Sequence, residues 1–215
     1  MLYMALILNN LGYMVLIADR SRRRELADIL TCELTQEGLV TYRNLDFYMA
    51  ADRREEENFV RQHQYSYVFD YVNEPEGDVI ADVTKAGYDG IIINTSCLRS
   101  ELRVSREIVM RAGVKVLVVI RDMPENIPKL KYIEKYYMNN VGICSLYAVP
   151  PDICDKEYQY KMDYEGIRSY RAMSSGYSCV LSKCICEISG RDDKSVKRAL
   201  RYLKEGKIFD NRLLE

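Results

Sequence analysis

Histidine, tryptophan and glycine-rich segments are scarce in this sequence, and their scarcity limits the chemistry that it can carry out. The 215 residues include no tryptophan, one histidine (His63) and 11 scattered glycines. Zinc sites and serine-histidine-aspartate triads both depend on histidine, so a lone histidine argues against either. None of the glycines leads into a Lys-Ser or Lys-Thr pair, the hallmark of a phosphate-binding loop. The sequence as it stands therefore predicts no catalytic residue and no bound cofactor.

Long apolar runs, export signals and strong net charge are also missing. The apolar first residues reach Asn9 and Asn10 too soon to span a bilayer, and they lack the basic segment and cleavage site of a signal peptide. A net charge of −1 argues against a domain that coats nucleic acid with its whole surface, although a local basic patch is compatible with it. Seven scattered cysteines, an odd number, fit free thiols in a reducing compartment. These features predict a cytoplasmic protein.

Short β-rich runs alternate with amphipathic segments along the chain. We expect strands over 13–18, 39–45, 67–71, 90–94, 114–120 and 141–149. We expect helices over 2–11, 21–34, 51–64, 77–87, 100–112, 128–138, 176–188 and 193–203. This alternation predicts an α/β fold with a mostly parallel central sheet of six or seven strands and helices on both faces. No repeat or low-complexity linker divides the sequence, so we expect one domain over residues 1–215.

Acidic residues end two of the expected strands. Asp19 follows the run GYMVLIA, and Asp70 lies within YVFDY. Ligands of parallel sheets bind at the carboxyl ends of the strands, so both carboxylates would project toward one crevice. Two carboxylates there can hold a hydrated magnesium ion if phosphates supply the other oxygens. The alternative is that each acid only caps the helix or turn that follows it.

This order of elements resembles that of ParA/MinD-type P-loop ATPases, which position plasmids, division sites or cell-pole machinery. GYMVLIAD is similar to the strand whose aspartate helps to organise magnesium, and YVFDY is similar to the Walker B strand. The resemblance therefore implies nucleotide and magnesium contacts at Asp19 and Asp70. It also implies contacts beside the base at Arg121, after VKVLVVI, and at the Pro150-Pro151-Asp152 turn, where Pro151 and Asp152 would cover the adenine.

A second alignment of the Walker B strand is open. YDGIIINTS also resembles that strand, with asparagine (Asn94) in place of the aspartate. We prefer Asp70, because it leaves the three later strands in the order of the family. Either alignment indicates weak or absent hydrolysis.

The family's phosphate loop and first strand have no counterpart in this sequence. We therefore expect a degenerate, non-hydrolysing member that acts as a positioning or scaffolding module. The family's first strand lies centrally in the sheet, so its absence would leave neighbouring strands with unpaired N–H and C=O groups. The first alternative is an active magnesium-ATPase whose strand and phosphate loop lie upstream of Met1, with ATP and Mg²⁺ as cofactors. The second is a regulatory domain of receiver or flavodoxin type.

Basic residues gather near the end of the chain at helical spacing. We expect them to share one helix face, at Lys194, Lys197, Arg198 and Arg201. ParA-like proteins contact DNA nonspecifically through basic patches, so the resemblance implies nonspecific DNA as one partner. A protein partner or a second copy of the chain is the partner class that we favour, and a solvated face balanced by acids is the alternative interpretation of the cluster. The acidic tail argues against membrane binding.

Overall fold

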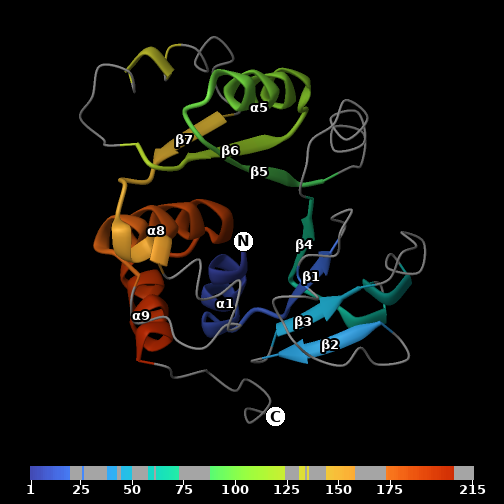
Figure 1. Ribbon diagram of the computed structural model, residues 1–215. Coiled ribbons are helices and arrows are strands. Elements are labelled where there is room, and N and C mark those ends of the chain that lie inside the picture. The colour runs from blue at the N-terminus through green and yellow to red at the C-terminus, as the bar shows by residue number, and fades with distance from the viewer. Residues whose placement is uncertain are drawn as a thin grey trace. The chain divides into compact units, whose positions relative to one another are not determined.

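The structure is a computed structural model, and its elements are labelled in Figure 1. It describes residues 1–19, 26, 38–42, 45–49, 58–60, 62–72, 88–123, 131–133, 135, 144–157 and 173–205. The helices expected over 21–34, 51–64, 77–87 and 128–138 lie wholly or mostly outside these residues. The chain divides into two compact units, which are Met1–Glu74 with Cys154–Glu215 (unit 1) and Pro75–Ile153 (unit 2).

Unit 1 contains a mixed sheet with the order β2-β3-β1-β4. Its strands are β1 (Val15–Asp19), β2 (Leu39–Tyr42), β3 (Leu45–Tyr48) and β4 (Tyr67–Tyr71). The central strand β1 pairs in parallel with β3 on one side and β4 on the other, and β2 pairs with β3 in antiparallel fashion. All five residues of β1 are buried. Such complete burial is what an unbroken apolar run favours in an internal parallel strand.

Three helices of unit 1 pack against one another (Figure 1). They are α1 (Leu2–Asn10), α8 (Ser175–Ser189) and α9 (Asp193–Lys204). Residues 2–9 of α1 are all buried, as expected for a helix that is apolar on every side. Ser174 caps the start of α8, where its hydroxyl accepts the Tyr177 N–H, and Gly190 caps the end in the left-handed region at φ 66°.

Unit 2 contains a purely parallel sheet with the order β5-β6-β7. Its strands are β5 (Gly90–Thr95), β6 (Lys115–Ile120) and β7 (Cys144–Ala148), and α5 (Arg99–Arg111) follows β5. The core forms between α5 and one face of the sheet, where strand residues at every second position pack together. These strand residues are Ile91, Ile93, Val116, Val118, Ile120, Cys144, Leu146 and Ala148.

The α/β class and the prevalence of parallel pairing are confirmed. The described strands, however, form two sheets rather than the single central sheet that we expected. The run expected as one strand over 39–45 contains β2, and its last residue, Leu45, belongs to β3, which pairs with β2 in antiparallel fashion. The single-domain interpretation stays a prediction. Among the described residues, no helix has the length and apolar character needed to cross a bilayer.

Each sheet has a parallel edge strand, β4 in unit 1 and β5 in unit 2, that pairs on one side only within the described residues. One hydrogen bond shows which β5 residues direct their backbone groups toward β6. The Thr95 carbonyl accepts the Arg121 N–H of the segment after β6. Backbone groups alternate sides along a strand, so those of Ile92 and Asn94 face away from β6. The β5 sequence GIIINT includes neither lysine nor proline, the residues that commonly protect an edge.

The left-handed glycine between α8 and α9 gives a stability prediction. An added Cβ at Gly190 meets no atom within 4 Å, so the cost of Gly190→Ala is the backbone cost of a positive φ alone. We expect this variant to lose about 1 kcal/mol of unfolding free energy. Gly113 is the matched control, since its added Cβ also meets nothing within 4 Å and its φ lies outside the left-handed region.

We expect Gly113→Ala to change the unfolding free energy by less than about 0.5 kcal/mol, or to raise it slightly. Urea unfolding followed by circular dichroism measures both variants. Equal losses in the two would contradict the assignment, because they would trace the cost to something other than the left-handed backbone.

Candidate functional site

The two predicted magnesium ligands lie on neighbouring parallel strands of unit 1. The pairing of β1 with β4 sets Ala18 opposite Asp70, and Asp19 opposite Tyr71. Residues opposite each other share a face of the sheet, and successive residues of a strand alternate faces. Asp19 and Asp70 therefore project from opposite faces, which argues against a single ion held by both from one crevice.

The contacts of Asp19 favour a capping role. Its side chain is buried, and its Oδ2 accepts the backbone N–H of Leu26 at 2.8 Å. Leu26 is helical, so the carboxylate satisfies a backbone donor in the connection that follows β1. Among the described residues, no three histidine, cysteine or acidic side chains are grouped closely enough to hold a metal ion. The magnesium role of Asp19 and Asp70 stays a prediction.

The residues predicted beside a nucleotide base lie in unit 2, at the carboxyl ends of β6 and β7. Backbone bonds join these ends, since the Val149 N–H donates to Ile120 and the Met123 N–H donates to Val149. The neighbouring strands thus place Arg121 beside the segment that continues into Pro151 and Asp152. Arg121 and Pro151 are exposed and Asp152 is half-buried. Asn94, the alternative Walker B position, is exposed near the end of β5.

The predicted basic cluster lies on one face of α9. Lys194, Lys197, Arg198 and Arg201 are all exposed. The opposite face of the helix packs inward and consists of Val196, Ala199, Leu200 and Leu203. This division confirms the helix and the shared face that the spacing predicted. A contact with nucleic acid stays a prediction.

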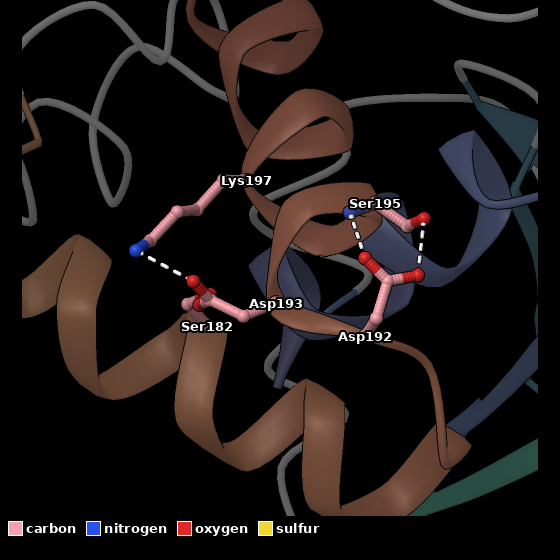
Figure 2. A network of polar contacts seen from close by, with 5 residues as sticks. All are labelled: Ser182, Asp192, Asp193, Ser195 and Lys197. Carbon is pink, nitrogen blue, oxygen red and sulfur yellow. Dashed lines mark hydrogen bonds and ion pairs between the residues drawn. The ribbon is translucent and has the colours of Figure 1, made fainter.

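Acidic residues at the start of α9 fix the helix and reduce the charge of this face (Figure 2). Asp193 bonds to Lys197 at 2.6 Å and accepts the Ser182 hydroxyl of α8 at 3.2 Å. Its bond to Lys197 lowers the pKa of the Asp193 carboxyl and raises the pKa of the lysine. Both side chains of the pair are more than half exposed, so we expect the ion pair to contribute little to stability. Any anion that binds Lys197 must compete with Asp193.

Lys194 and Arg198 are the basic residues of this face that are best placed to meet an external anion. Within the part of the chain that the structure describes, neither side chain has an ion pair with an acid. Arg198 Nε instead donates to the Tyr202 hydroxyl at 3.0 Å, and this bond leaves the positive charge uncompensated. Arg201, by comparison, forms an ion pair with Glu205, and its Nε lies 3.9 Å from the Glu205 Oε1.

The sequence interpretation missed Arg191 and three tyrosines near the basic face. Arg191 precedes α9, and its Nε donates to the Tyr13 hydroxyl at 2.9 Å. The ring of Tyr67 meets that of Tyr13 edge-on, with centroids 5.1 Å apart. A spacing of four residues on a helix was a usable signal for Arg198 and Tyr202. No local signal connects Arg191 to Tyr13, because 178 positions separate them.

The described cysteines are free thiols, as expected. Burial raises the pKa of Cys184 to about 12, so this thiol stays protonated at neutral pH and is a poor nucleophile. Cys97 is half-buried and packs against the core of unit 2. Cys32 lies outside the described residues.

A scan against models of protein families found no match to this sequence, and a search of curated proteins found none. The family resemblance therefore depends on the sequence motifs.

The first residue before α9 gives a prediction on stability and pH. The Asp192 carboxylate accepts the backbone N–H of Ser195 at 3.0 Å and its hydroxyl at 2.7 Å, and these bonds lower its pKa (Figure 2). We expect Asp192→Ala to lower the thermal midpoint at pH 7, because the cap is removed. Asp192→Asn is the matched control and should stay close to the parent, because asparagine caps equally well.

The lowered pKa also fixes the direction of the pH effect. The contribution of Asp192 is complete above the unfolded pKa of about 3.9 and is lost as the pH falls through the lower folded value. The stability advantage of the parent over Asp192→Ala should therefore shrink below pH 4, as thermal scans from pH 7 to pH 2 would measure. An advantage that is independent of pH would contradict a charged cap.

Proposed function

We propose that this chain is a non-hydrolysing interaction module of ParA/MinD-like architecture, and that the basic face of α9 binds nucleic-acid phosphates without sequence preference. The observation that carries the proposal is the division of α9 into a packed apolar face and an exposed face with four basic residues. Lysine and arginine on such a face neutralise phosphates and release condensed counterions, which favours binding to any sequence.

The sequence and the strand register support a module that does not hydrolyse nucleotides. No glycine-rich loop with a following lysine is present to hold the phosphates of a nucleotide. Asp19 and Asp70 project from opposite faces of the β1–β4 pair, and Asp19 accepts a backbone N–H. The acids that the resemblance assigns to magnesium thus have a structural use, at least at Asp19.

The binding proposal is tested with two neutralised residues on α9. Random-sequence 30-nucleotide DNA, offered as a duplex and as a single strand, should bind the parent weakly and with strong salt dependence. Lys194→Gln with Arg198→Gln should weaken binding to all sequences and reduce the slope of log K against log salt by about 2, because each substitution leaves one phosphate without its cation. Fluorescence anisotropy over a salt series measures both quantities.

A matched control separates the α9 face from overall charge. Arg99→Gln with Arg103→Gln changes the net charge equally, at exposed positions of α5 in unit 2. We expect this variant to bind like the parent. Equal losses in the two double variants, or no binding by the parent to either form of DNA at low salt, would overturn the proposal and leave a protein partner or a second copy as the remaining candidates.

An active magnesium-ATPase is the second candidate, and the edge strands β4 and β5 are the observation that favours it. The resemblance implies a central first strand, and β4 and β5 are parallel edge strands that each have one strand partner among the described residues. A strand and phosphate loop encoded upstream of Met1 would supply a partner for one of these edges and the phosphate site. Translation of the DNA upstream of Met1, in frame, tests this candidate. We expect it to encode a glycine-rich segment that ends in Gly-Lys-Thr or Gly-Lys-Ser if the candidate is correct.

Hydrolysis assays discriminate between the two candidates. We expect the 215-residue chain to release no phosphate from ATP above background with magnesium, with or without DNA. Asp70→Ala should leave that background unchanged. Magnesium-dependent turnover that Asp70→Ala abolishes would overturn the non-hydrolysing proposal.

A further inference from the structure

Two tyrosine rings lie near Arg191, which precedes α9. The Arg191 Nε–H donates to the Tyr13 hydroxyl at 2.9 Å, and the Arg191 Cζ lies 5.4 Å from the centroid of that ring. The ring of Tyr67 meets Tyr13 at 88°. Tyr13 and Tyr67 are both half-buried, and Arg191 is exposed. The Arg191 guanidinium is thus held beside an aromatic pair, and the Arg191 side chain is open to solvent.

A second group of the same kind lies in the last turns of α9. Arg198 Nε donates to the Tyr202 hydroxyl, and the Cζ of Arg198 lies 5.6 Å from the Tyr202 centroid. The Cζ of Arg201 lies 5.9 Å from the same centroid. Arg198 and Arg201 are exposed, and Tyr202 is half-buried. Arg191 lies two residues before α9, and Arg198 lies about 7.5 Å along the helix from its first residue, Asp193, at 1.5 Å a residue.

The charge of this face alone is moderate. Between residues 191 and 205, the six basic side chains of Arg191, Lys194, Lys197, Arg198, Arg201 and Lys204 are offset by three acidic ones, Asp192, Asp193 and Glu205. Nonspecific duplex binding depends almost entirely on phosphate contacts, so acids in the same face weaken it. Arginine planes and tyrosine rings add a contribution to the binding free energy that does not depend on charge, because unstacked bases stack on both groups. Only a single strand offers such bases.

We propose that the basic face of α9 and the flanking Arg–Tyr groups bind single-stranded nucleic acid in preference to a duplex. This inference rests on the proposed function and adds the class of nucleic acid to it. Lys194 and Arg198 contact backbone phosphates, while bases stack on the Arg191–Tyr13 group and on Tyr202 with Arg201. Stacking tolerates any base, so the preference is for strandedness rather than sequence.

The test compares a fluorescein-labelled 20-nucleotide oligothymidine with a 20-base-pair duplex over a salt series. We expect the single strand to bind at least tenfold more tightly at physiological salt, with a shallower salt slope. Tyr13→Leu and Tyr202→Leu should each weaken single-strand binding by about 5- to 100-fold and leave duplex binding within twofold. Tyr202→Phe keeps the ring and should bind the single strand within a few-fold of the parent.

Tyr132→Leu is the matched control, because Tyr132 is an exposed tyrosine of unit 2. It should bind both ligands like the parent, and circular dichroism should show that every variant is folded. Duplex binding as tight as single-strand binding, or equal losses in Tyr202→Phe and Tyr202→Leu, would overturn this inference while the proposed function stands. No binding to either ligand would overturn the proposed function, and this inference with it.

Discussion

The sheet of unit 1 depends on the hydrogen bonds of β1, which pairs in parallel with β3 and β4 at the same time. All five residues of β1 are buried, and backbone pairing on both sides sets its register with the two neighbours. This constraint also decides the chemistry at the strand ends. With Ala18 held opposite Asp70, the next residue, Asp19, must project from the other face. The packing of an apolar strand thus separates two carboxylates that the sequence suggests are a pair.

The helix α9 is constrained from both of its sides. Its apolar face packs within unit 1 against α1 and α8, and Asp193 bonds across to Ser182 of α8 (Figure 2). The same acid pairs with Lys197, so the contact that fixes the helix also removes part of its positive charge. A face arranged in this way is poorly suited to hold a duplex by charge alone. The tyrosine rings that orient Arg191 and Arg198 offer an additional, uncharged contact for a ligand.

Sequence patterns predicted the elements well where the pattern is local. The apolar runs of β1, β4, β5 and β6 and the helical spacing of α9 each gave an element close to its observed bounds. The division between β2 and β3 was missed, because the run from Leu39 to Leu45 includes no glycine or proline that would mark it. The opposite orientation of Asp19 and Asp70 was out of reach, since strand register is set by partners and not by the strand itself. The Arg191–Tyr13 contact was out of reach for the same reason.

The composition of the edge strand β5 favours pairing with a further strand. The described part of β5 presents the backbone groups of Ile92 and Asn94 away from β6, in a run of aliphatic residues with no protective charge. Unprotected parallel edges of this composition are prone to pair with other strands. An edge of this composition is compatible with both functional candidates, an interaction module and a fold completed by a further strand.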